Sequence, residues 1–169
     1  METTRREIAL FASDMLGVQT LVGQFDRRGS AALARADRRR LRDLIEETEL
    51  PTLVLDPRAG LHIIDISDAY VATTGAVRTR ICGHKLFDMF PDNPDLPEAN
   101  GVSNLFESLQ KAAQSGRTHS MGVQRYDTQD TDGQFTERYW RPMNTPVFDQ
   151  EGRLRYLLNQ VVEVSISRP

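Results

Sequence analysis

The chain has 169 residues and a formal net charge of −3 at pH 7, a length that allows one domain of ordinary size plus an extension. Its 39% hydrophobic and 27% charged residues are typical of a globular protein. The sequence contains no basic stripe suited to nucleic acid, no signal peptide and no apolar run of the ~20 residues needed to span a membrane. Cys82 is the single cysteine, which excludes an intrachain disulfide. We therefore expect a cytoplasmic protein with neither nucleic-acid nor membrane partners.

Residues 1–48 contain no proline and are predicted to form an N-terminal helical extension. Apolar side chains recur every three or four positions, which places them on one stripe of a first helix: Ile8, Phe11, Met15, Val18, Val22 and Phe25. A second helix is expected after Ser30, with Leu41, Leu44 and Ile45 on one face. The stripe fits either a helix packed on its own domain or a homodimer contact. We favour the dimer contact, because the stripe is wider than one small sheet domain usually covers.

Residues 49–166 are predicted to form one domain with strands and short helices. Two apolar runs on either side of the turn at Pro57 to Gly60 indicate a hairpin. A short helix capped by Asp68 should follow, and then a longer helix over residues 102–113 that ends at Gly116.

Three long strands are expected at the C-terminal end, over residues 118–129, 134–148 and 153–165. In the last of them, we expect the even positions from Leu154 to Val164 to form the inner face. The order of elements predicts an α+β fold, a five-stranded antiparallel sheet with helices on one face. The N-terminal helices would then cover the other face.

Several segments resemble Per-Arnt-Sim (PAS) domains. Gly83-His-Lys-Leu-Phe-Asp-Met-Phe-Pro-Asp-Asn-Pro94 and Arg138-Tyr-Trp-Arg-Pro-Met-Asn-Thr-Pro146 are similar to segments of PAS modules near the front of bacterial hybrid histidine kinases. The resemblance covers residues 50–165 and implies the PAS fold. It also implies a sensory module of bacterial signal transduction that binds a small molecule or none, and dimerises. Such a module passes a conformational change to an output domain, or to a separate partner such as a histidine kinase of a two-component system.

The resemblance implies a cavity between the longer helix and the inner face of the sheet. We expect its wall to include these apolar residues, unless they fill a closed core: Phe87, Phe90, Leu105, Leu109, Met121, Val123, Tyr139, Met143, Leu158 and Val162. By parity Gln160 would point inward, and Asn144 is a second candidate of the same kind. A buried amide needs a partner, which could be a backbone group, a water or a polar ligand atom. Trp140 is expected to pack on the sheet and to meet the N-terminal helix.

Single residues bear on the cofactors that related branches of the family bind. The flavin photoreceptor branch uses a reactive cysteine shortly after a glycine in the segment matching Gly83, and here Leu86 stands near that place, so a flavin adduct is not expected. His84 is the candidate haem ligand, but it lies beside Lys85 in a polar setting, whereas an axial histidine needs an apolar pocket. No catalytic or metal-binding constellation is visible, so no enzyme is expected. Three functions stay open: a small-molecule sensor, a pure dimerisation and docking module, and a haem-based redox or gas sensor.

Overall fold

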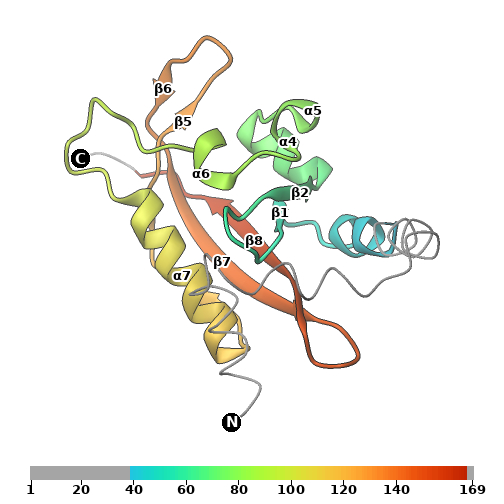
Figure 1. The fold of residues 1–169 in the computed structure, drawn as a ribbon. Helices are drawn as coiled ribbons and strands as arrows, with labels where there is room; N and C mark the ends of the chain where they lie inside the picture. Colours follow the sequence, from blue (N-terminus) through green and yellow to red (C-terminus); the bar gives the residue numbers. More distant parts are fainter. Residues whose placement is uncertain (1–38, 167–169) are drawn as a thin grey trace.

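An antiparallel sheet forms the centre of residues 39–166, the part of the chain that the computed structural model describes (Figure 1). Its order is β2-β1-β8-β7-β3, and β4 also pairs with β7. Because β3 and β4 lie one after the other along β7, the sheet has the five strand positions that the sequence predicts. The strands are β1 (Thr52–Leu55), β2 (Ile63–Ile66), β3 (His119–Ser120), β4 (Gln124–Arg125), β7 (Tyr139–Phe148) and β8 (Leu154–Glu163).

Four helices lie between β2 and β3 and pack on one face of the sheet (Figure 1). They are α4 (Asp68–Thr74), α5 (Arg78–Ile81), α6 (Leu86–Met89) and α7 (Gly101–Ser115). The predicted end of α7 is confirmed: Gly116 follows it with φ of 66°, a left-handed conformation that glycine adopts without strain. The predicted cap of α4 was one residue late, because the Ser67 hydroxyl accepts the backbone N–H of Tyr70 at 3.1 Å and Asp68 is already helical.

The first two of the three long C-terminal strands are interrupted, contrary to expectation. After β4 the chain leaves the main sheet and forms the separate hairpin of β5 (Thr128–Gln129) and β6 (Phe135–Thr136). The break coincides with two contacts to the loop after α6. The Tyr126 hydroxyl donates to the carbonyl of Phe90, and the Asp127 carboxylate accepts from Asn93 Nδ2 at 2.9 Å. These contacts hold the chain against the loop instead of along a continuous ladder.

Asp127 is a buried carboxylate whose side chain is 2% exposed. Burial raises its pKa, but hydrogen bonds from Arg125 and Asn93 outweigh that effect, so the pKa lies below its usual value. Arg125 Nε lies 3.0 Å from Asp127 Oδ1, and its guanidinium also pairs with Glu137. The ionised form of Asp127 therefore stabilises the fold.

The main core lies between the sheet and the helices, and it uses the odd positions of β8. Leu157 and Val161 belong to it, together with Leu53 of β1 and Leu109 of α7. The expectation that the even positions face inward was therefore wrong, except for Leu154, which does belong to the main core. β8 is a central strand covered on both faces, so apolar residues occupy both parities and alternation alone does not identify the inner one.

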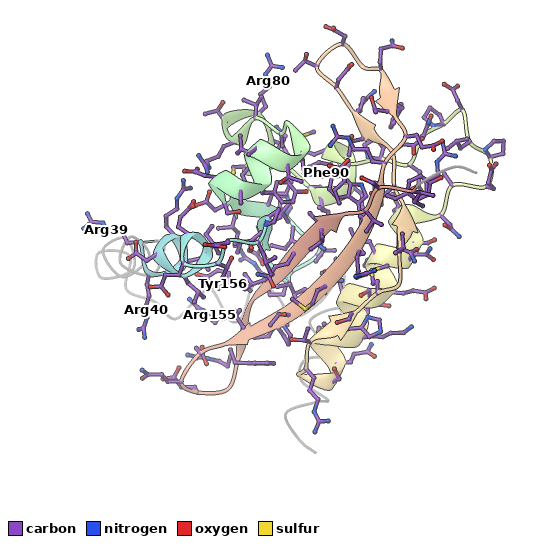
Figure 2. The ribbon with its side chains drawn as sticks, turned by 180° about the vertical axis from the view of Figure 1, so that it is seen from behind. Arg39, Arg40, Arg80, Phe90, Arg155 and Tyr156 are labelled. Atoms are coloured by element: carbon purple, nitrogen blue, oxygen red, sulfur yellow. The ribbon has the colours of Figure 1, made fainter. Side chains whose placement is uncertain are left out.

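The opposite face of the sheet is covered at one end by helical residues 39–46. Leu41 and Ile45 of this segment pack on Val54 of β1 and Leu158 of β8, and Ile45 is fully buried. For these residues, the predicted cover of the second face by N-terminal helix is confirmed. Figure 2 shows Arg39 and Arg40 projecting away from the sheet, and both are exposed.

An ion-pair cluster fixes the 39–46 helix to the domain. Both carboxylate oxygens of Asp65 on β2 accept hydrogen bonds from the Arg42 guanidinium at 2.9 Å. Arg78 of α5 joins the cluster by pairing with Asp65 at 3.3 Å and with Asp68 at 2.6 Å. The Glu46 carboxylate accepts the backbone N–H of Asp68 at 3.2 Å. The cluster therefore links the helix to three separate elements.

The stripe proposed for the dimer contact, Ile8 to Phe25, lies outside the described residues. Within residues 39–166, no helix is long and apolar enough to cross a membrane.

Candidate functional site

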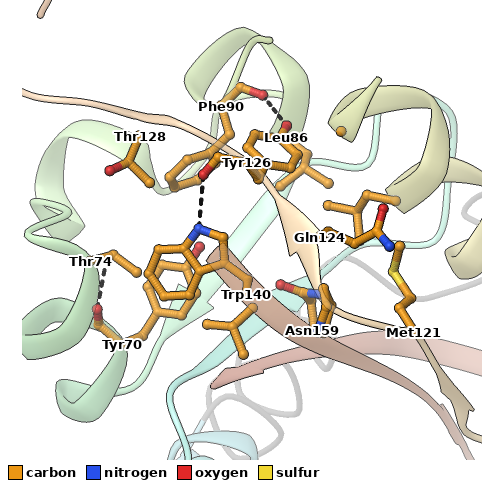
Figure 3. A pocket seen from close by; sticks show the side chains of 14 residues that line it. Tyr70, Thr74, Leu86, Phe90, Met121, Gln124, Tyr126, Thr128, Trp140 and Asn159 are labelled. Carbon is orange, nitrogen blue, oxygen red and sulfur yellow. Dashed lines mark hydrogen bonds between the residues drawn. The ribbon is translucent and has the colours of Figure 1, made fainter. Parts of the chain in front are cut away.

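A small cavity lies between the inner face of the sheet and the helices that cover it (Figure 3). Its volume is about 60 Å³, room for roughly four to six water molecules at about 10–15 Å³ each. The wall draws on α4, α6, α7 and the strands β4, β5, β7 and β8. The lining residues are Tyr70, Thr74, Leu86, Phe90, Gly101, Leu105, Met121, Gln124, Tyr126, Thr128, Trp140, Pro142, Asn159 and Val161.

The aromatic side chains at the cavity hold the helices to the strands. The indole N–H of Trp140 donates to the carbonyl of Tyr126 at 2.9 Å, and the Tyr126 hydroxyl donates to the carbonyl of Phe90 (Figure 3). The Phe90 ring meets the Tyr70 ring edge-on, with 6.3 Å between centroids. Gly101 begins α7 where a Cβ atom would come within 2.5 Å of the Tyr126 ring, so only glycine allows this approach. These contacts preorganise one side of the cavity.

Two deeply buried wall residues carry a polar group without a hydrogen-bond partner among residues 39–166, and the hydroxyl of the half-buried wall residue Thr128 has none there either. The Tyr70 hydroxyl neither donates nor accepts a hydrogen bond there, and the Asn159 Oδ1 atom accepts none. The two residues are nevertheless only 5% and 4% exposed. Both line the cavity, and Figure 3 shows the two side chains flanking Trp140. Burial raises the pKa of Tyr70, so its hydroxyl stays protonated at neutral pH. The deeply buried part of the wall therefore offers the Tyr70 hydroxyl and the Asn159 amide oxygen to an occupant.

A chain of buried hydrogen bonds runs from the cavity to β3. Asn159 Nδ2 donates to Asn144 Oδ1 at 2.9 Å, and Asn144 Nδ2 donates to Ser108 Oγ at 2.7 Å. Ser108 Oγ lies 2.7 Å from His119 Nδ1. Every buried side-chain polar atom in the described part of the chain has a partner or reaches accessible space. The chain therefore fixes both amides, and Asn144 is buried as the sequence predicts.

The structure brings three of the predicted wall residues to the cavity: Phe90, Leu105 and Met121. Leu109 is fully buried in the core beside it, and Phe87 packs on Phe106 at 6.4 Å between ring centroids. The remaining predicted residues do not line it. Val123 and Val162 are exposed, and Tyr139 and Met143 alternate with the inward residues of β7. Asn144 belongs to the hydrogen-bond chain, and Leu158 and Gln160 lie on the opposite face of β8.

Gln160 is not the inward amide that parity suggested. Its Nε2 atom donates to the Thr52 hydroxyl at 3.2 Å on the face that carries Leu158. The inward amide is its neighbour Asn159. Trp140 likewise faces the cavity and not the 39–46 helix. Trp140, Pro142 and Asn144 are alternate residues of β7 and therefore lie on one face of the strand. Grouping these three residues would have identified the inner face of the sheet.

No family model and no curated protein matches this sequence. Solved structures with the same fold include a light-oxygen-voltage domain studied with a flavin analogue (TM-score 0.53, 16% identity, 73% of this chain and 83% of that one). A light-oxygen-voltage protein of Rhodobacter sphaeroides matches with TM-score 0.55 and 13% identity over 73% of this chain and 65% of that one. The PAS domain of the fruit-fly ELK potassium channel matches with TM-score 0.52 and 15% identity over 72% and 92%.

The fold is therefore that of a PAS domain, with an antiparallel sheet, helices on one face and a cavity between them. Identities this low establish the fold and leave the function to the site itself.

The residues at the cavity do not fit a flavin or a haem. Benzene occupies an apolar cavity of about 150 Å³, and both cofactors are larger than benzene, whereas this cavity has about 60 Å³. Leu86 presents a carbon side chain to the cavity where the resemblance would place a thiol. Cys82 lies elsewhere, beside a hollow between the 39–46 helix and α5. His84 is exposed and does not line the cavity, so the haem ligand considered from the sequence is not in place.

Proposed function

We propose that this chain is a sensory PAS domain that binds a small molecule between α7 and the sheet. The observation that supports this most directly is a preformed, largely apolar cavity whose wall includes unpartnered polar groups on two deeply buried residues, Tyr70 and Asn159. Small-molecule sites usually have this composition, with a few polar groups that fix orientation. A core that served packing alone would gain stability by filling the space with hydrocarbon.

β8 offers a route from the cavity to the opposite face of the sheet. Asn159 lines the cavity, and the adjacent Leu158 packs on Leu41 and Ile45 of the 39–46 helix. An occupant that shifts β8 would therefore change the packing of this helix, which is the population shift that a sensor needs. The receiver would be an output domain or a partner, with a bacterial histidine kinase as the sequence-based expectation.

The test compares two valine-to-phenylalanine variants on neighbouring positions of β8. Val161→Phe fills the cavity, and Val162→Phe adds the same ring at a residue that is 46% exposed on the other face. Thermal unfolding of the wild type and of both variants is followed by the fluorescence of the single tryptophan, Trp140, in the presence of each of a panel of small neutral molecules. A true ligand at 100 times its Kd stabilises the wild type and Val162→Phe by about 2.7 kcal/mol, but not Val161→Phe. Equal responses of the two variants would contradict the proposal.

We also propose that the chain forms a homodimer through its N-terminal stripe. Val18→Asp or Val22→Asp should convert a dimer into a monomer whose PAS domain stays folded. Native mass spectrometry measures the subunit number and any retained ligand together. Two dimeric variants would show that the stripe is not the dimer contact.

A further inference from the structure

The free polar atoms of the cavity limit what can bind there. Tyr70 and Asn159 are about as buried as the leucines around them, and a buried polar group is normally satisfied. Tyr70 contributes a protonated hydroxyl, which donates readily to an acceptor. An occupant that reaches both residues therefore has a polar head, while the rest of it meets Leu86, Leu105 and Val161.

The orientation of the Asn159 amide follows from its partners. Asn144 Nδ2 lies 3.9 Å from the sulfur of Met121, which can only accept, and 2.7 Å from Ser108 Oγ. This places the nitrogen of Asn144 toward Met121 and Ser108, so its oxygen accepts from Asn159 Nδ2. The remaining atom of the Asn159 amide, Oδ1, is then an acceptor directed at the cavity. The Ser108 hydroxyl accepts from Asn144 and also bonds His119 Nδ1 at 2.7 Å, as the donor when the imidazole carries its proton on Nε2.

The cavity wall also determines the charge of the occupant. None of the residues lining it is Asp, Glu, Lys, Arg or His. An ion placed there would lose its hydration without gaining a counter-charge, which is far more costly than burying a neutral polar group. A neutral occupant is thus strongly favoured over an anion or a cation of the same size.

We propose that the cavity takes a small neutral molecule whose head both donates to Asn159 Oδ1 and accepts from the Tyr70 hydroxyl, such as an amide or an alcohol. The Asn144–Ser108–His119 chain is the positioning device that keeps the acceptor of Asn159 aimed at this head. The inference rests on the proposed ligand-binding function and names its chemical class.

The test uses three probes of nearly equal size and different heads. Acetamide donates and accepts, acetonitrile only accepts, and acetate is an anion at pH 7.5. Xenon serves as a fourth probe that reports the cavity without any head. Binding is measured by shifts of the Trp140 indole and the Asn159 side-chain amide in ¹⁵N NMR spectra. We expect acetamide to bind about tenfold more tightly than acetonitrile, as for a lost buried hydrogen bond, and acetate to bind least.

The variants separate the head group from the positioning chain. Tyr70→Phe and Asn159→Leu should each reduce the preference for acetamide over acetonitrile to about twofold or less. Gln160→Leu is the matched control, because Gln160 is the next residue of β8 and its amide bonds Thr52 on the opposite face. It should keep the full preference. His119→Phe frees the Ser108 hydroxyl to turn toward Asn144, so both amides can flip and the preference should fall although the cavity is unchanged.

The outcomes distinguish the two proposals. If acetamide and acetonitrile bind equally while xenon binds, the assigned head group is wrong and the ligand-binding cavity stands. If no probe, xenon included, shifts the Trp140 or Asn159 signals, the proposed function itself fails. If the preference exists but survives in Tyr70→Phe and Asn159→Leu, the inference is overturned, because another group then recognises the head. If His119→Phe keeps the full preference, the positioning role is overturned.

Discussion

The docking of the 39–46 helix on the outer face of the sheet gives a quantitative prediction for Ile45→Ala. Ile45 is fully buried against Val54 and Leu158. The substitution removes three buried carbons, worth about 2.4 kcal/mol at about 0.8 kcal/mol each. The cavity left behind adds to this cost, so we expect a loss of about 2.4–4 kcal/mol in the free energy of unfolding.

Leu44→Ala is the matched control for this measurement. Leu44 is the preceding residue of the same helix, but it is 42% exposed and should change stability by only about 0.5 kcal/mol. Both variants are unfolded in urea and followed through the fluorescence of Trp140, which is 3% exposed in the core on the other side of the sheet. A cost for Ile45→Ala no larger than that for Leu44→Ala would refute the docking.

Three further predictions follow from single contacts. Arg42→Met should lower the unfolding free energy in urea by about 1 kcal/mol, and much less in 1 M NaCl, because its ion pairs are partly exposed; a salt-independent loss would contradict the ion-pair reasoning. The pKa of Asp127 is lower in the folded state, so its contribution is present above the unfolded value of about 3.9 and is lost as pH falls further. Asp127→Asn should therefore be less stable than the wild type at pH 7 and approach it below about pH 3; a pH-independent difference would argue against an ionised Asp127. Gly101→Ala should cost about 1–3 kcal/mol in thermal unfolding through contact with the Tyr126 ring, whereas Gly122→Ala, with no atom within 4 Å, should be near neutral; equal effects would show that the ring moves freely.

The order of elements could be predicted because local chemistry marks it. Gly116 ends α7, and Pro57 to Gly60 separate β1 from β2, and each signal depends on residues that are neighbours in sequence. Of the three residues expected on one face of the second helix, Leu41 and Ile45 identify the side that covers the sheet, whereas Leu44 is exposed. These are consequences of periodicity and turn chemistry alone.

The wall of the cavity could be predicted only in part, because it depends on contacts between distant segments. Leu157 and Leu158 are both buried, one on each face of β8, and hydrophobicity cannot say which of the two faces α7. Tyr70 and Tyr126 reach the cavity from elements separated by more than fifty residues of chain. The inner face is also the one on which Asn144 bonds Ser108 of α7, and no local pattern shows that pairing.

β8, the strand whose inner face was wrongly assigned from its sequence, also links the cavity to the 39–46 helix. Asn159 is held on the inner face by the hydrogen bond to Asn144, and Leu158 is held on the outer face by Leu41 and Ile45. Because adjacent residues of a strand point to opposite faces, a shift of β8 that brings Asn159 toward an occupant draws Leu158 away from the helix. The ion pairs of Arg42 resist undocking of that helix, since they attach it to β2 and α4 independently of β8. Under the proposed function, occupancy of the cavity would therefore oppose docking of the helix through β8, and the ion pairs of Arg42 would limit how far the helix responds.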